Sequence, residues 1–197
     1  MELLLNLTDF EAKARSLGAA ESQVPYALSR ALNDAAKVAR VVLTETTWPT
    51  SVNAVNKSFI KAALVTNFSR KDNLRVEIFD RLGRASLWRH NYGGTKLPKG
   101  SNLAIPVKGK FSRGTWGIPK AQRPRALIAA TPKRALRITP KGIFIGQGGR
   151  LVLQYSFKPM AVQPADVPFE RDFTEAMRRA VEASFPERMA LAMRTAR

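Results

Sequence analysis

The sequence of 197 residues contains no cysteine and a single histidine, His90. The missing thiols exclude a disulfide framework, a thiolate metal site and a cysteine nucleophile. One histidine excludes a metal site built from two histidines and leaves a Ser-His-Asp triad only one possible base. No apolar run approaches the roughly 20 residues that cross a bilayer, and the start Met1-Glu2-Leu3-Leu4-Leu5 is too short and too acidic for a signal peptide. We therefore expect a soluble protein, made inside the cell, that contacts no membrane.

Acidic residues are missing from one long stretch of the chain. The sequence has 33 lysines and arginines against 15 acids, a net charge of +18. Residues 81–165 carry 17 basic residues and no acid, whereas residues 1–80 carry 10 and 9, and residues 166–197 carry 6 and 6. Such a segment repels itself unless counter-ions or a partner screen it. It predicts contact with an anionic partner, either nucleic acid or an acidic protein; the alternative is a solvated basic face that only aids solubility.

Helical periodicity is strongest after Ser22. Apolar residues recur there at spacings of three and four, which predicts one helix of about 24 residues that ends at Trp48-Pro49. The stripe comprises Val24, Leu28, Ala31, Ala35, Val38 and Val42, and its alanines imply close packing. Before it, residues 2–7 read as a strand and residues 9–17 as a short helix, and a further helix is possible over 50–60.

Alternating residues predict several strands. A hairpin is expected over 61–67 and 73–79, an edge strand at 103–107 because of Pro106, and three strands at 135–139, 142–146 and 150–157. Residues 81–130 hold many glycines and prolines, which indicates an extended basic loop insertion. A last helix begins near Asp166, and Pro186 is expected to break it.

These elements predict the α+β class. Long N-terminal and C-terminal helices would pack on a small, mostly antiparallel sheet, within one domain over 1–197 that carries the insertion at 81–130.

Residues that carry catalysis are sparse, so we expect no enzyme. His90 has no acid within its own 85-residue segment, although a distant aspartate could approach it in space. The close trio Asp72, Glu77 and Asp80 falls on the wet side of a strand rather than at metal-ligand spacing. Gly93-Gly94-Thr95-Lys96 lacks the spacing of a phosphate loop. Gly146-Gln147-Gly148-Gly149 lacks the third glycine of the dinucleotide-binding fingerprint G-x-G-x-x-G, so both are predicted to be turns.

Short motifs near the two ends of the chain carry a family resemblance. Residues 7–10 (LTDF), followed by residues 24–36 (VPYALSRALNDAA), resemble the opening of the minor tail protein Z family of long-tailed phages. Residues 157–164 (FKPMAVQP), followed by an amphipathic helix, are similar to the junction before that family's last helix. Residues 90–99 (HNYGGTKLPK) with 103–106 (LAIP) are similar to a segment of phage neck and tail-completion proteins.

The resemblance implies a structural virion protein, present in the host cytoplasm during assembly. It would complete the head-proximal end of the tail and help to join the tail to the DNA-filled head. It would form a homo-oligomeric, hexameric ring that meets tail terminator, tail tube and head–tail connector proteins and the end of the packaged DNA. The resemblance implies no cofactor, no metal and no catalytic residue.

On this hypothesis, two groups of side chains are expected to make contacts. Eight cations would face DNA or acidic neighbours: Lys96, Lys99, Lys108, Lys110, Arg113, Lys120, Arg123 and Arg125. Phe169, Phe173 and Met177 would pack the last helix on the core or on a neighbouring subunit. Two alternatives stay open: a free nucleic-acid-binding protein of ribosomal or architectural type that uses residues 81–165, and a Mg²⁺-dependent nuclease that uses Asp72, Glu77 and Asp80.

Overall fold

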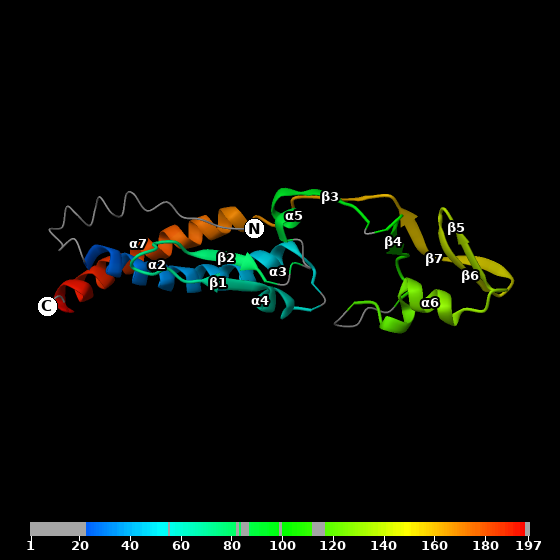
Figure 1. Cartoon of the computed structure of the whole chain (residues 1–197), viewed down its shortest axis with the longest axis horizontal. Coiled ribbons are helices and arrows are strands. Elements are labelled where there is room, and N and C mark those ends of the chain that lie inside the picture. Colours follow the sequence, from blue (N-terminus) through cyan, green and yellow to red (C-terminus); the bar gives the residue numbers. More distant parts are fainter. Residues whose placement is uncertain are drawn as a thin grey trace. The chain divides into compact units, whose positions relative to one another are not determined.

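The computed structural model describes residues 23–54, 56–81, 83, 87–98, 100–111 and 117–195. The chain divides into two compact units. The helical unit comprises Met1–Asn53, Lys57–Tyr92 and Ala165–Arg197, and the basic unit comprises Ala54–Asn56 and Gly93–Pro164. As predicted, the chain is α+β, with long helices towards both ends and small antiparallel sheets (Figure 1). The strand expected over 2–7 and the helix expected over 9–17 lie outside the described residues.

The first long helix of the helical unit is α2 (Gln23–Val41). Its alanine stripe is fully buried, as the periodicity predicts, and the buried set includes Ala27, Ala31, Ala35, Ala36 and Ala39. Val38 departs from the prediction, because its side chain is 49% exposed rather than buried.

The helical path does not end at Trp48-Pro49, so that prediction is wrong. It continues through the π-helix η1 (Val42–Thr47) into α3 (Trp48–Ser51). In the wider π turn the Trp48 N–H bonds to the Leu43 carbonyl, and Pro49 then falls in the first turn of α3, where a missing N–H is tolerated. The helix expected over 50–60 is also wrong: α3 ends at Ser51, and the short α4 (Phe59–Ala63) follows.

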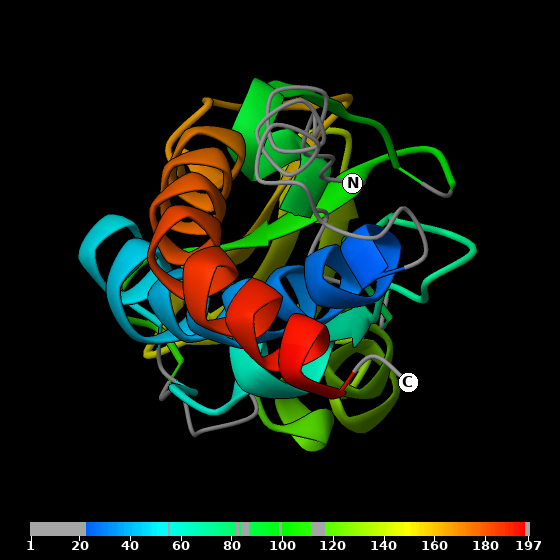
Figure 2. The same cartoon turned by 90° about the vertical axis from the view of Figure 1, so that its left-hand side faces the viewer.

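The second long helix, α7 (Phe169–Thr195), runs antiparallel to α2 and beside it (Figures 1 and 2). The break expected at Pro186 is absent, because the buried stripe continues in phase on both sides of the proline. The stripe comprises Phe169, Phe173, Met177, Val181, Phe185, Met189 and Ala192. Met193, near the end of α7, lies outside this stripe and is 47% exposed.

A hairpin completes the helical unit. Strands β1 (Leu64–Asn67) and β2 (Glu77–Asp80) pair antiparallel, as predicted, and Val76 and Ile78 are buried. The Asn33 amide of α2 bonds the Ser69 backbone twice: its nitrogen donates to the carbonyl at 3.0 Å, and its oxygen accepts from the N–H at 2.7 Å. Arg40 donates to the Leu64 and Lys61 carbonyls. These contacts bind the hairpin to α2. The short helix α5 (Leu87–Tyr92) also belongs to this unit.

The basic unit contains a four-stranded antiparallel sheet of order β4-β7-β6-β5. Its strands are β4 (Leu103–Pro106), β5 (Leu136–Thr139), β6 (Gly142–Gln147) and β7 (Arg150–Lys158). The strand that contains Pro106 lies at the edge, as predicted. Gly148 and Gly149 both have positive φ and form the predicted turn between β6 and β7.

Smaller elements complete the basic unit. Strand β3 (Gly94–Lys96) pairs with β8 (Ala161–Gln163), and the 3₁₀ turn η2 (Lys120–Gln122) precedes α6 (Pro124–Ala130). Within the expected insertion over 81–130, strand β4 pairs with β7, which lies beyond that range. The compact unit extends to Pro164 for this reason. That residues 1–197 form a single domain stays a prediction.

Candidate functional site

The basic unit exposes its positive charge. Residues 93–164 hold 14 of the chain's lysines and arginines and no acid, so no cation there can find a carboxylate within the unit. Each basic side chain of the unit that the structure describes is exposed. The unit therefore presents uncompensated charge to whatever surrounds it.

Six of the eight cations predicted to make contacts are described, and all six are exposed. Lys96 ends β3, Lys108 and Lys110 follow β4, Lys120 begins η2, and Arg123 and Arg125 flank the start of α6. Lys99 and Arg113 lie outside the described residues. The prediction omitted six equally exposed cations: Lys133, Arg134, Arg137, Lys141, Arg150 and Lys158. The same acid-free pattern would have identified them.

The two faces of the β5-β6-β7 sheet differ. On one face Ile143 lies opposite Tyr155, and both are buried. The Tyr155 ring packs 4.9 Å from the Phe111 ring, and its hydroxyl donates to the Gln122 carbonyl at 2.8 Å. Burial raises the pKa of Tyr155, although the Arg123 charge acts in the opposite direction. This face forms the core of the basic unit.

The other face of the same sheet is open. Arg137 pairs with Phe144, and Phe144 with Leu153, which places them on one side. A hollow of about 450 Å³ lies there, and Leu151 at its edge is 59% exposed. The hollow is lined by Arg137, Thr139, Pro140, Lys141, Phe144 and Leu151. We call these six residues the basic sheet face.

A groove of about 690 Å³ runs between α2 and α7 in the helical unit. Its apolar lining consists of Ala35, Val38, Val42, Ala176, Ala180 and Ala183. Its polar lining consists of Asp34, Asp172, Glu175, Glu187, Arg179 and Ser184. Three of its four carboxylates are already paired with cations: Asp34 with Lys37 and Arg188, Asp172 with Arg171, and Glu175 with Arg179. We call the twelve lining residues the α2-α7 groove.

Asp34 at the groove is part of an ion-pair cluster. The Arg188 guanidinium lies 2.6 Å from its carboxylate and the Lys37 ammonium 3.2 Å. Burial alone would raise the pKa of Asp34, but the hydrogen bonds and charges of Lys37 and Arg188 outweigh it and hold the pKa below its ordinary value. The cluster joins α2 to α7.

His90 meets an acid from far along the chain. Its Nδ1 lies 2.7 Å from Asp166 Oδ1, and its carbonyl accepts from the N–H groups of Asp166 and Val167. The Trp48 ring meets the His90 ring edge-on at 5.3 Å and stacks on Phe169 at 6.0 Å. The aspartate that the sequence placed beyond the acid-free segment therefore binds α5 to the chain before α7.

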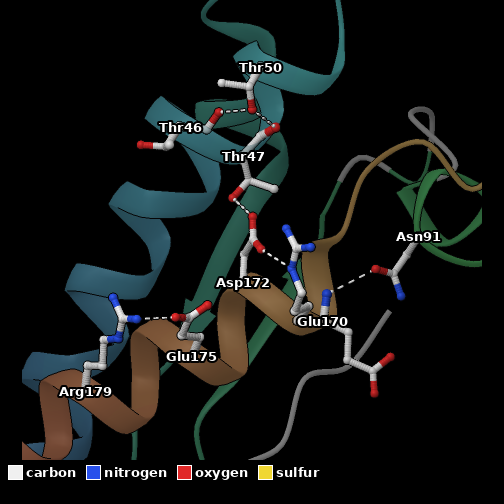
Figure 3. A network of polar contacts seen from close by, with 9 residues as sticks. Thr46, Thr47, Thr50, Asn91, Glu170, Asp172, Glu175 and Arg179 are labelled. Carbon is white, nitrogen blue, oxygen red and sulfur yellow. Dashed lines mark hydrogen bonds and ion pairs between the residues drawn. The ribbon is translucent and has the colours of Figure 1, made fainter.

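The first turn of α7 is held by side chains from other elements (Figure 3). The Glu170 N–H donates to Asn91 Oδ1 at 3.0 Å, and the Thr47 hydroxyl donates to Asp172 Oδ2 at 2.7 Å. The Tyr92 hydroxyl donates to Glu170 at 2.6 Å, which is the main cause of a raised pKa of Tyr92. The π-helix η1 thus supplies the threonine that anchors α7.

The structure brings together no metal-binding trio from Asp72, Glu77 and Asp80. Glu77 pairs with Arg75 at 2.8 Å, and Asp80 accepts from the Gly83 N–H. Within the described ranges, no three His, Asp or Glu side chains are grouped to hold a metal ion. Phe169, Phe173 and Met177, for which core and neighbour packing were both open, lie fully buried in the core of the helical unit.

Comparison with known proteins gives no relative from which a function can be transferred. No family model, no curated protein and no solved structure matches this chain. In the part of the chain that the structure describes, none of the helices combines the length and apolar surface of a bilayer crossing.

Proposed function

We propose that this chain is a structural virion protein of a phage tail or neck. It completes the head-proximal end of the tail and helps to join the tail to the DNA-filled head. The observation that carries the proposal is the segregation of charge: all 14 cations of residues 93–164 lie in a unit without an acid, whereas the helical unit contains ion pairs such as Asp34–Arg188 and Glu175–Arg179. The motif resemblance near both ends of the chain supports the same function.

Such a protein works by contact. The basic unit meets the end of the packaged DNA or the acidic surfaces of tail terminator, tail tube and connector proteins, and the helical unit provides the frame. In a homo-oligomeric ring, one basic unit per subunit forms a positive collar. Charge of this kind attracts a polyanion and speeds its encounter without reading its sequence.

Deletion of the gene from its phage genome tests the proposal. We expect particles with incomplete tails or unjoined heads and tails in electron micrographs, and loss of infectivity. A plasmid copy of the gene should restore both, and a frameshifted copy serves as the matched control. Normal, infectious tailed virions from the deletion strain would contradict the proposal.

A free nucleic-acid-binding protein is the second candidate, favoured by the exposure of every described cation in the basic unit. Such a protein binds duplex DNA or RNA alone, and its affinity falls steeply with salt, by a log–log slope of about −0.9 for each phosphate neutralised on duplex DNA. Tight, salt-dependent binding by the purified chain together with normal virions from the deletion strain would favour this candidate.

A further inference from the structure

The open side of the four-stranded sheet extends beyond the basic sheet face. Residues directly opposite one another in an antiparallel pair lie on the same side of a sheet, and so do residues two apart on one strand. Gly142, two residues before Phe144, lies opposite Ser156, and Ser156 lies opposite Ile105 of the edge strand β4. Ile105 is 38% exposed, and Lys158, two residues after Ser156, is exposed. The open side therefore spans all four strands and carries Lys158 as well as the cations of the basic sheet face.

The cations on this open side are not neutralised within the described part of the chain. Residues 93–164 contain no acid, and Arg137, Lys141 and Lys158 form no ion pair with a described residue. A protein surface usually carries both signs of charge, whereas a nucleic-acid strand carries only negative charge along its backbone. Cations without a single acid among them therefore favour nucleic acid over a folded protein as the occupant.

The hollow in the basic sheet face presents an aromatic ring among these cations. Phe144 is half-buried and lines the hollow together with Arg137 and Lys141. Aromatic side chains in a basic groove bind single strands by stacking on the bases, whatever the sequence. In a duplex the bases present only their edges in the grooves, because their flat faces are stacked on one another. A ring that lines an open hollow therefore favours an unpaired base over a duplex.

We propose that the open side of this sheet binds single-stranded nucleic acid. One base stacks on Phe144 in the hollow, and Arg137, Lys141 and Lys158 contact the flanking phosphates. The proposal rests on the proposed function in that the end of the packaged DNA would supply the strand, and it names the surface that receives it. A duplex and an acidic polypeptide are the other occupants that the charge would attract, and the experiments below distinguish them.

Binding by the purified full chain is measured by the fluorescence anisotropy of a labelled thymidylate strand of about 16 nucleotides. The matched ligand is an abasic deoxyribose-phosphate strand of the same length, which carries the same charge but no base. We expect the wild type to bind the thymidylate strand at least about five-fold more tightly, the factor that one stacked base contributes. This comparison needs no variant, so it does not depend on whether a substituted chain folds.

Substitution of the ring assigns the base preference to the hollow. Phe144→Leu keeps an apolar side chain but removes the flat ring, so it should abolish most of the preference for the thymidylate strand. Phe144→Tyr keeps the ring and should retain the preference. Phe68→Leu is the matched control, because Phe68 is a ring of the helical unit that is 51% exposed, and it should behave as the wild type. Circular dichroism checks that each variant is folded.

Salt dependence separates the phosphate contacts from the base contact. Lys141→Gln should reduce the log–log slope of affinity against salt by about 0.7, the value for one phosphate of a single strand, and leave the base preference unchanged. Phe144→Leu should do the opposite and leave the slope unchanged. Arg178→Gln in α7 makes the same change in net charge at an exposed position of the helical unit, and it should alter neither quantity.

Four results would overturn the proposal: equal affinity for the thymidylate and abasic strands, a duplex of the same length that binds more tightly than the single strand, a polyglutamate of equal charge that binds as tightly, or equal losses from Phe144→Leu and Phe68→Leu. A chain that shows no preference for the single strand but is required for tailed virions would remove this site and leave the proposed function standing. Binding as expected by a chain that is dispensable for virions would do the reverse.

Discussion

The helical unit and the basic unit differ in whether their charged side chains form ion pairs within the unit. In the helical unit, acids pair with bases. Asp34 of α2 pairs with Arg188 of α7, and Glu175 pairs with Arg179 within α7. The basic unit has no acid within residues 93–164, so its repulsion has to be screened from outside. Counter-ions or an anionic partner can supply that screening to the basic unit, whereas the ion pairs of the helical unit lie within it.

The two units also differ in how they are packed. In the helical unit, seven side chains of α7 form one continuous buried stripe. In the basic unit, Ile143 and Tyr155 are buried, while several large apolar side chains are half exposed. Buried apolar packing is therefore concentrated in the helical unit, whereas both units expose large apolar side chains.

The largest expected effect is on the helical core. Phe173 is fully buried, and Phe173→Ala should lower the free energy of unfolding by about 4 kcal/mol. Urea denaturation measures the loss, and hydrogen exchange locates it in α2 and α7. The matched change in the basic unit, Phe144→Ala, removes a half-buried ring and should cost about half as much. Equal losses would contradict the difference in packing.

The glycine at the start of β6 leaves no room for a side chain. Gly142 has φ +155°, and a Cβ there would lie 2.0 Å from the Tyr155 carbonyl oxygen. Gly142→Ala should destabilise the sheet by about 3 kcal/mol, seen as faster hydrogen exchange in β6 and β7 alone. Gly148→Ala is the control: φ is +55° but the space is open, so only backbone strain of about 1 kcal/mol remains. Similar effects at both positions would show that the close approach is unimportant.

Pro186 lies within α7, and its replacement should increase the stability of the helical unit. Pro186 has no N–H to donate to the Glu182 carbonyl, so Pro186→Ala should stabilise the helical unit by about 2 kcal/mol. Pro168 precedes the helix, and Pro168→Ala should change stability by less than about 0.5 kcal/mol. A destabilised Pro186→Ala variant would show that the proline contributes more to stability than the hydrogen bond it removes.

Pro49 and Pro186 are the positions at which the helix ends predicted from the sequence were wrong. At Pro49 the preceding π turn places the proline in the first turn of α3, and at Pro186 the buried stripe of α7 continues on both sides of the proline. Local patterns did predict the β1-β2 hairpin, the edge position of β4 and the Gly148-Gly149 turn, because each depends on a few neighbouring residues. Packing between residues far apart in the sequence cannot be predicted from such local patterns.

The candidate site was predictable in its charge but not in its geometry. The basic segment was predictable because the absence of acids over 85 residues is visible in the sequence itself. The approach of Asp166 to His90, 76 residues away, depends on tertiary structure. So does the exposure of Val38, which helical periodicity assigned to the core.

A smaller effect is expected for the ion pair between the two helices. Since Asp34 has a lowered pKa in the folded state, its contribution to stability is present above its ordinary value of 3.8 and is lost as pH falls through the folded value. Asp34→Asn should cost about 0.5 kcal/mol at neutral pH, because both partners are partly exposed, and nothing in strong acid. Stability curves against pH check this, with Glu182→Gln as an exposed control. A pH-independent difference would contradict the ion-pair assignment.

The smallest expected effect is that of salt, which should stabilise the basic unit and destabilise the helical unit. Salt at about 0.1 M screens charges beyond about 10 Å, so it should relieve repulsion in the basic unit and weaken the ion pairs of the helical unit. Each change is expected to stay below about 1 kcal/mol. Hydrogen exchange at low and moderate salt should show slower exchange in β5, β6 and β7 and slightly faster exchange in α7. Replacing Lys141 and Lys158 with glutamine should reduce the response of the sheet, because fewer charges repel. If salt changes the stability of both units with the same sign, unpaired charge does not distinguish them, and the proposal of an anionic partner for the basic unit loses its physical basis.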